Sequence, residues 1–387
     1  MPAIITGRLF SGPRHGQEID GRDLAQSHCS KLQQLRQVSN DPIKMDVVDG
    51  QEAKKNIDTI EPLGNFHLAL KNAEVEKASF NQAPSDDFQS LFRERGINRL
   101  VVIGDSLSDS DGRMCSKTMG LLPSSTAYYQ GRFTNGFTWP EFLASPSFMG
   151  TTLVNMAEGG AVASRHSISP AFLFVSNMGR QIKGVRFQES DIVFLALGSN
   201  DYMTFGKTNI AKVISTHDKN IKKLISAGVK HIIVVGVPDL SKTVYAHSQD
   251  RAPDYRSRME ELSTNHNIQL REKISQLQNE YASIGLFIRF FDIQARFEEL
   301  TDLAKQTGYE TTKNFCEGYI SLKDWAKITS ESKLNTDHRY IFHDQVHPSQ
   351  EVHQILASRM FNFIRDELKK VWTTEGRSEQ VSNLPVN

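Results

Sequence analysis

The chain has 387 residues, and its 45 Lys and Arg residues balance its 45 Asp and Glu residues, so the formal net charge is zero. This balance argues against a protein that binds nucleic acid through a global positive field. The three cysteines, Cys29, Cys115 and Cys316, are too few for a disulfide framework and fit no zinc-ligand spacing.

The N-terminal region differs from the rest of the chain. It has no charged segment followed by a long apolar core, so it is no Sec-type signal peptide. No apolar run approaches the roughly 20 residues that span a bilayer, and we therefore expect a soluble protein. Residues 1–95 are mostly polar with scattered prolines, and we expect a partly disordered leader followed by a small accessory region.

From residue 96 onward, apolar runs alternate with helical patterns. This alternation predicts an α/β fold, a parallel sheet between two layers of helices, over residues 96–372. The polar residues 373–387 are expected to form a flexible tail. The predicted strands are 100–103, 152–155, 192–197, 231–237 and 286–291, and the predicted helices include 210–227, 255–281 and 350–370.

The first predicted strand ends at Gly104, and Asp105 and Ser106 follow it directly. Open α/β sheets bind their ligands at the carboxyl ends of their strands, so Ser106 is a candidate nucleophile. If a helix follows, its first free N–H groups point at anything bound to that serine. The alternative is that Asp105 and Ser106 only cap this helix.

Three further segments carry polar residues suited to acyl transfer, namely 155–160, 198–201 and 344–348. Acyl transfer needs a nucleophile, a base, a group that orients the base, and donors for the oxyanion. His347 is the best base, and Asp344, three residues earlier, can hold its other ring nitrogen. The backbone N–H groups of Ser106 and Gly160 and the side-chain amide of Asn200 are candidate oxyanion donors.

Each segment also has a simpler explanation. Gly159 and Gly160 are typical of a tight turn, Asn200 is typical of a helix cap, and Asp344 with His347 could be a surface pair. Their joint occurrence, in this order and after successive predicted strands, favours a hydrolytic site. The chemistry requires no metal or cofactor.

These segments resemble the conserved blocks of the GDSL, or SGNH, hydrolase superfamily. The resemblance implies that Ser106 is the nucleophile, that Gly160 and Asn200 complete the oxyanion hole, and that Asp344 and His347 complete the triad. Gly160 is chosen over Gly159 by counting from Asn155. Segments 104–114, 131–139, 157–160, 200–203 and 346–353 are similar to the glycerophospholipid:cholesterol acyltransferase branch, which includes type III secreted effectors.

Membership of that branch implies a secreted bacterial effector that acts at host membranes such as the pathogen-containing vacuole. Its acyl donor would be a phospholipid, giving phospholipase A activity, and its acceptor would be water or cholesterol. A host Rho-family GTPase in its GTP-bound form, such as RhoA, would activate it. Residues 1–95 match nothing in the branch, so their secretory or regulatory role stays a hypothesis.

Aromatic residues crowd one loop between the first two predicted strands. They are candidates for contacts with an acyl chain or with a bilayer interface, and ordinary packing within the loop is the alternative. The candidate substrate-binding residues are Tyr128, Phe133, Phe137 and Trp139.

Two other functions stay open from the sequence. The first is a plain esterase or lysophospholipase of the same superfamily, without sterol transfer, acting on soluble or carbohydrate esters. The second is a binding module for a host GTPase with a vestigial site. The aromatic loop argues against the first, and the intact set of five site residues argues against the second.

Overall fold

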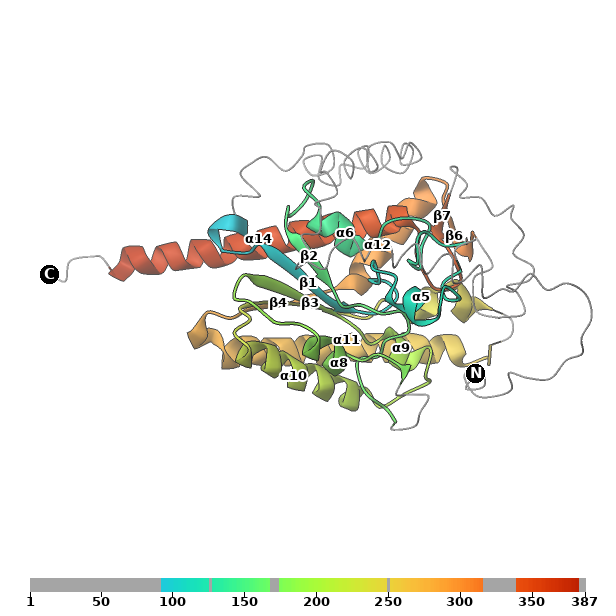
Figure 1. Cartoon of the computed structure of the whole chain (residues 1–387), viewed down its shortest axis with the longest axis horizontal. Helices are drawn as coiled ribbons and strands as arrows, with labels where there is room; N and C mark the ends of the chain where they lie inside the picture. The colour runs from blue at the N-terminus through green and yellow to red at the C-terminus, as the bar shows by residue number, and fades with distance from the viewer. Residues whose placement is uncertain (1–91, 125–126, 168–173, 249–250, 316–338, 383–387) are drawn as a thin grey trace, which may run out of the picture.

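The computed structural model describes residues 92–124, 127–167, 174–248, 251–315 and 339–382, with side chains to residue 371 (Figure 1). The expected leader and nearly all of the accessory region at 1–95 therefore lie outside the described residues. Among the described residues, no helix is both long enough and apolar enough to cross a bilayer.

A five-stranded parallel sheet forms the centre of the fold, which confirms the predicted three-layer α/β class. The strand order is β2-β1-β3-β4-β5, so the first strand lies between the second and the third. The strands are β1 (Arg99–Gly104), β2 (Thr152–Asn155), β3 (Asp191–Ala196), β4 (His231–Val235) and β5 (Phe287–Phe291).

Helices cover both faces of this sheet (Figure 1). The sequence of β1 is continuously apolar because both of its faces are buried. Leu100 and Val102 face one hydrophobic core, and Val101 and Ile103 face the other. The first core also contains residues of α6 (Trp139–Ala144), α12 (Ile293–Gln306) and α14 (Gln350–Ser382). The second contains residues of α8 (Met178–Lys183), α10 (Ile210–Ser226) and α11 (Tyr255–Glu280).

The last helix is longer than the sequence predicted. We expected a helix at 350–370 and a flexible tail from 373, but α14 continues to Ser382, a length of 33 residues. Once its first turns are fixed by packing, each further residue adds a helical hydrogen bond at little cost. The predicted end of this helix at residue 370 was therefore wrong, since the polar composition that indicated a tail is equally compatible with further helical turns.

A second, two-stranded parallel sheet was not predicted. It joins β6 (Glu310–Asn314) to β7 (Tyr340–Phe342), and β6 is too polar to be recognised as a strand from its sequence. Phe342 also forms a bridge with Pro348, which folds the intervening loop back on itself. The remaining short elements are α5 (Arg113–Lys117), α9 (Ser199–Tyr202) and the 3₁₀ turns Leu240–Lys242, Val244–His247 and Ala282–Ile284.

Candidate active site

Three residues from distant parts of the chain form a continuous hydrogen-bonded row. Ser106 Oγ lies 2.7 Å from His347 Nε2, although 241 positions separate the two residues. His347 Nδ1 lies 2.7 Å from Asp344 Oδ2. This order matches a nucleophile, a general base and an orienting carboxylate.

Ser106 does not stand at the start of a helix. Residues 105–108 form a bend and turn, and the next helix, α5, begins only at Arg113. The condition that a helix follows Ser106 directly is therefore not met, and the alternative that Asp105 and Ser106 only cap such a helix was wrong. The Asp105 carboxylate instead accepts the Leu107 N–H at 3.1 Å. This bond closes a local turn that has Ser106 at its centre.

The Asp344 carboxylate is fully buried, which rules out the alternative of a surface pair. Its Oδ1 accepts the backbone N–H groups of Val346 and His347, at 2.8 and 2.7 Å, and this turn explains the three-residue spacing. Burial alone would raise the pKa of Asp344. The neighbouring His347 and the hydrogen bonds outweigh burial and lower that pKa to about 2, so the carboxylate stays ionised.

Two backbone N–H groups beside Ser106 are suited to bind an oxyanion. Within the described part of the chain, neither the Ser106 N–H nor the Gly160 N–H makes a hydrogen bond. The Gly159 N–H donates to Asp109 Oδ2 at 3.0 Å, so it is already occupied. This difference favours Gly160 over its neighbour as the donor.

Asn200 lies in the first turn of α9, directly after β3. Its Nδ2 donates to the Ala161 carbonyl at 3.0 Å, and its Oδ1 accepts the Thr204 hydroxyl at 2.6 Å. An amide nitrogen carries two hydrogens, so one remains for a ligand. The three candidate donors follow β1, β2 and β3, which are neighbours in the sheet and end at the same edge, so the sheet order places all three at one edge.

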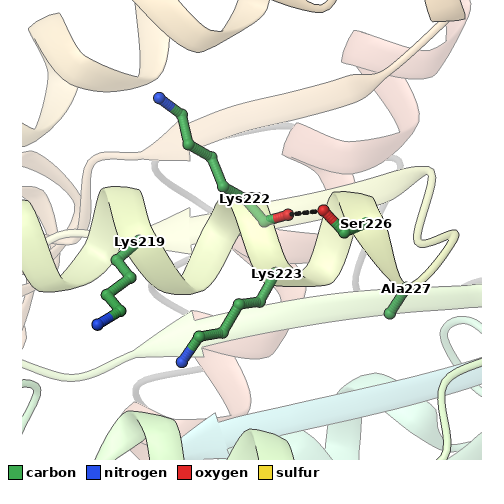
Figure 2. Close-up of a pocket in the computed structure, with 5 residues that line it drawn as sticks. All are labelled: Lys219, Lys222, Lys223, Ser226 and Ala227. Carbon is green, nitrogen blue, oxygen red and sulfur yellow. Dashed lines mark hydrogen bonds between the residues drawn. The ribbon is translucent and has the colours of Figure 1, made fainter.

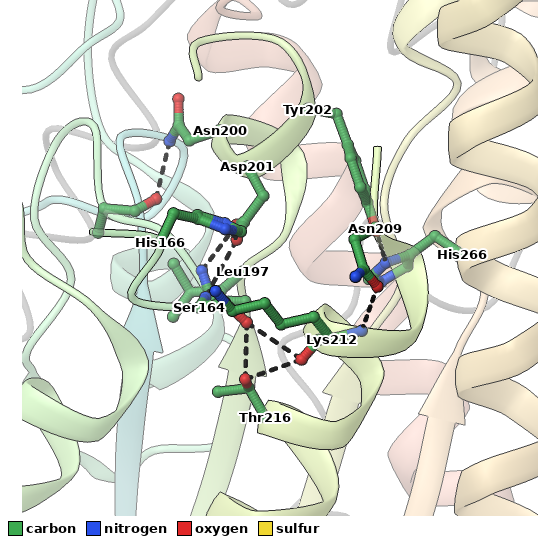
Figure 3. A network of polar contacts seen from close by, with 12 residues as sticks. Ser164, His166, Leu197, Asn200, Asp201, Tyr202, Asn209, Lys212, Thr216 and His266 are labelled. Carbon is green, nitrogen blue, oxygen red and sulfur yellow. Dashed lines mark hydrogen bonds and ion pairs between the residues drawn. The ribbon is translucent and has the colours of Figure 1, made fainter. Parts of the chain in front are cut away.

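A buried carboxylate next to Asn200 was not recognised as part of the site. Asp201 accepts the backbone N–H groups of Ala163 and Ser164, at 2.8 and 3.0 Å, and contacts His166 Nε2 at 2.6 Å (Figure 3). It therefore fixes the segment that follows Gly160. The signal was an acidic residue directly after the candidate Asn, which we interpreted only as part of a cap.

Two buried amides also support the nucleophile turn. Asn155 Nδ2 donates to the Ser108 carbonyl at 2.5 Å and to Ser110 Oγ at 2.7 Å. Gln181 pairs with both backbone groups of Gly104, at 2.9 and 2.8 Å, where β1 has passed the end of β2. Side chains thus replace the missing strand partner just before Ser106.

The four candidate substrate-binding aromatics pack inside the protein. The Tyr128 hydroxyl donates to Asp344 Oδ2 at 2.6 Å, the Phe133 ring lies 5.0 Å from the His347 ring, and Trp139 Nε1 donates to the Ser108 hydroxyl at 3.1 Å. Phe137 is half-buried and packs against the hydrophobic core. The structure therefore favours loop packing around the triad over direct contact with an acyl chain or a bilayer.

Several titratable groups are buried in the described part of the protein. Burial lowers the pKa of five histidines and raises the pKa of three buried carboxyls. The histidines are His217 and His231, with a pKa of about 4, His353, with a pKa of about 3, His266 and His343. The carboxyls are Asp105, with a pKa of about 7, Asp109, with a pKa of about 6, and Glu351.

A hollow of about 480 Å³ lies on the surface of α10, lined by Lys219, Lys222, Lys223, Ser226 and Ala227 (Figure 2). Ala227 lies just before the start of β4, so the hollow is near the amino ends of the strands. The candidate active site is at their carboxyl ends. The hollow is therefore not part of this site.

The fold and the site define an α/β enzyme of the acylhydrolase class. Residues 100–360 match the family model described as GDSL-like Lipase/Acylhydrolase, and the chain belongs to this family. It is an enzyme of the lipase and acylhydrolase type, as the motifs predicted.

Among its relatives is the secreted effector protein SseJ of Salmonella typhimurium, which is 38% identical over 270 residues. The match covers 69% of this chain and 64% of SseJ, so the chain spans slightly less than two thirds of that relative. The phosphatidylcholine-sterol acyltransferase of Aeromonas hydrophila is 28% identical, over 70% of this chain and 91% of that protein. These matches confirm the resemblance predicted from the motifs, which extends to SseJ itself.

Proposed function

We propose that this chain is a secreted effector that removes an acyl chain from a glycerophospholipid and transfers it to cholesterol or water. The observation that carries the proposal is the row from Ser106 through His347 to Asp344, with 2.7 Å at each step. The N–H groups of Ser106 and Gly160, which follow the neighbouring strands β1 and β2, make no hydrogen bond in the described structure.

In the first half-reaction, Ser106 Oγ attacks the ester carbonyl carbon while His347 Nε2 takes the hydroxyl proton. The oxyanion is stabilised by the N–H groups of Ser106 and Gly160 and by the Asn200 amide. Collapse of the tetrahedral intermediate breaks the ester bond. His347 returns the proton to the departing lysophospholipid oxygen, and the acyl chain stays on Ser106 as an ester.

In the second half-reaction, the hydroxyl group of water or of a sterol gives its proton to His347 and attacks the acyl carbon. The second tetrahedral intermediate expels Ser106, whose oxygen recovers the proton. Asp344 stabilises the imidazolium in both halves and stays ionised. A sterol acceptor yields a cholesteryl ester, and water yields a free fatty acid.

Exposed apolar side chains beside the oxyanion turn support a membrane-borne substrate. Met119, Leu121 and Phe174, here called the apolar rim, are 66%, 43% and 43% exposed. Met119 and Leu121 follow Lys117, whose ammonium lies 4.3 Å from the centre of the Phe174 ring. Lys117 also pairs with Glu158, two residues before Gly160. Exposed apolar groups of this kind bind to lipid surfaces more readily than to soluble esters.

The biological setting is proposed from the relatives. SseJ is named as a secreted effector and the Aeromonas enzyme as a phosphatidylcholine-sterol acyltransferase, which supports secretion, a phospholipid donor and a sterol acceptor. Export by type III secretion, action on host membranes and activation by GTP-bound RhoA or a related GTPase rest on the motif resemblance to the acyltransferase branch.

Product analysis on phosphatidylcholine–cholesterol vesicles tests the proposal, with wild type beside Ser106→Ala and with or without GTP-loaded RhoA. We expect cholesteryl ester from the wild type with the GTPase and no acyl product from Ser106→Ala, which should still fold. Free fatty acid alone, indifferent to the GTPase, would indicate the plain esterase or lysophospholipase. Equal inactivity of both proteins under every condition would favour a GTPase-binding module with a vestigial site.

The apolar rim has its own test. Replacing Met119, Leu121 and Phe174 together with serine should lower the rate on vesicles at least tenfold and leave hydrolysis of soluble p-nitrophenyl butyrate within twofold. Ile268→Ser is the matched control, because Ile268 is equally exposed but lies on α11. Equal loss on both substrates, or none on vesicles, would remove the rim from substrate recognition.

A further inference from the structure

The Tyr128 hydroxyl and His347 bind the same oxygen of the triad carboxylate. Asp344 Oδ2 accepts the Tyr128 O–H at 2.6 Å and the His347 Nδ1–H at 2.7 Å. We propose that Tyr128 is a positioning residue, whose hydroxyl shares Asp344 Oδ2 and thereby weakens the hold of Asp344 on the protonated His347. This inference rests on the proposed function, since it assigns Tyr128 a role in the same acyl-transfer site.

The hydrogen bonds of Asp344 show why the Tyr128 hydroxyl matters. A carboxylate has about four acceptor positions. Two are filled on Oδ1 by the N–H groups of Val346 and His347, and two on Oδ2 by His347 Nδ1 and Tyr128. Among the described residues, Tyr128 is thus the one hydrogen-bond partner of the Asp344 carboxylate outside the segment 344–347. Its O–H draws negative charge away from the oxygen that faces the imidazole.

The surrounding rings fix the direction of the Tyr128 hydroxyl. Tyr128 is 3% exposed and packs edge-on against His343, at 5.1 Å between ring centres, and against Phe133, at 6.3 Å. The Phe133 ring in turn lies against His347 at 5.0 Å. Tyr128 and Phe133 therefore hold the carboxylate and the imidazole from one side, which leaves little freedom for either.

Polar contacts anchor the loop that carries these rings. The Thr134 hydroxyl donates to the Pro348 carbonyl at 2.9 Å. The Asn135 side chain accepts the Gln350 N–H at 2.8 Å, and the Gln350 side chain accepts the Phe137 N–H at 2.8 Å. These bonds join the loop to the residues directly after His347. They explain a sequence block at 131–139 that the triad alone does not require.

Other titratable groups face the same pair and must be accounted for. His343 lies on the triad loop and His353 on α14, and burial lowers the pKa of both, so they are neutral near pH 7. Asp105 on the nucleophile turn has a pKa raised by burial to about 7, and it interacts with His347. These groups are unchanged in a Tyr128 variant, so a difference between the two pH profiles isolates the hydroxyl.

The test is the pH dependence of kcat/KM for p-nitrophenyl butyrate hydrolysis between pH 5 and 9. Tyr128→Phe removes only the hydroxyl, and Tyr129→Phe is the matched control, since the half-buried Tyr129 ring packs on Phe137 instead. We expect the acid limb of Tyr128→Phe to move up by about 0.5 pH units, because the unshared carboxylate holds the imidazolium more tightly. Tyr129→Phe should overlay the wild type.

A second variant tests the same inference, and we expect it to shift the acid limb in the opposite direction. Difluorotyrosine at position 128 is a stronger donor of similar size, so it should move the acid limb to lower pH even if Tyr128→Phe folds poorly. Acid limbs that coincide in the wild type and the folded position-128 variants would overturn the proposal. Wild-type activity that persists in Ser106→Ala would instead overturn the proposed function, and the role of Tyr128 with it.

Discussion

Removal of the Asp201 carboxylate should loosen the oxyanion side of the site. In Asp201→Ala, the buried N–H groups of Ala163 and Ser164 lose their partner, and His166 loses its ion-pair acceptor. Each buried donor left unsatisfied costs about 1–3 kcal/mol, so we expect a loss of about 3 kcal/mol in the free energy of unfolding. For a domain of this size, that corresponds to a fall in Tm of roughly 6–12 °C.

Catalysis should suffer as well, because the freed N–H groups begin at Ala163, three residues after Gly160. Displacement of an oxyanion donor by about 1 Å costs on the order of 100-fold in rate, and we expect kcat/KM to fall by about that factor. Thermal unfolding and p-nitrophenyl ester hydrolysis measure the two effects. Asp218→Ala is the control, since the Asp218 pair with Lys222 is partly exposed and worth about 1 kcal/mol or less.

The reasoning is refuted if Asp201→Ala unfolds within 2 °C of the Asp218→Ala control, on the order of the ~1 kcal/mol effect expected of a partly exposed pair. It is also refuted if Asp201→Ala loses stability as expected but retains full kcat/KM. That second result would show that the segment after Gly160 does not set the position of the oxyanion donors.

Two further predictions concern the glycine turn and pH. A Cβ on Gly159 would lie 2.4 Å from Phe133 Cε2, so Gly159→Ala should displace that ring, cost about 1–3 kcal/mol and reduce turnover more than tenfold. A Cβ on Gly160 has space, but the φ of +73° disfavours any other residue, so Gly160→Ala should cost about 1 kcal/mol of stability. This variant keeps its backbone N–H and should lose less activity than Gly159→Ala. A greater loss of activity in Gly160→Ala than in Gly159→Ala, measured in parallel assays, would contradict the donor assignment. The buried histidines stay neutral in the folded state, while the unfolded chain binds protons below about pH 6.5, so stability should fall from pH 6.5 to 4. The three buried carboxyls act in the opposite direction but are fewer than the five histidines, and a chemical-denaturation midpoint that rises as the pH falls over this range would show that the carboxyls dominate.

Much of the fold could be predicted because the relevant signals are local. Every residue of the run 100–103 is apolar, which is typical of a strand whose sheet is covered by helices on both faces. This pattern predicted the three layers. The spacing of Asp344 and His347 is likewise local, since a turn three residues long brings the carboxylate to the imidazole. These features depend on a few adjacent residues.

The parts that escaped prediction depend on contacts between distant residues. Tyr128 and Asp344 are 216 positions apart, and nothing in the sequence of the aromatic loop distinguishes a ring that holds the triad from one that binds lipid. Gln181 pairs with Gly104 across 77 positions, because β2 stops short of the end of β1. The polar strand β6 forms only because β7 is present to pair with it.

The 241 positions between Ser106 and His347 also have a consequence for synthesis. A growing chain contains its nucleophile 241 positions before it contains its base. All five strands of the central sheet precede His347 in the chain, so a nascent or truncated chain that ends before His347 lacks the base of the triad even when its sheet has formed. Acyl-transfer chemistry of this kind therefore arises only after the whole central sheet has been synthesised.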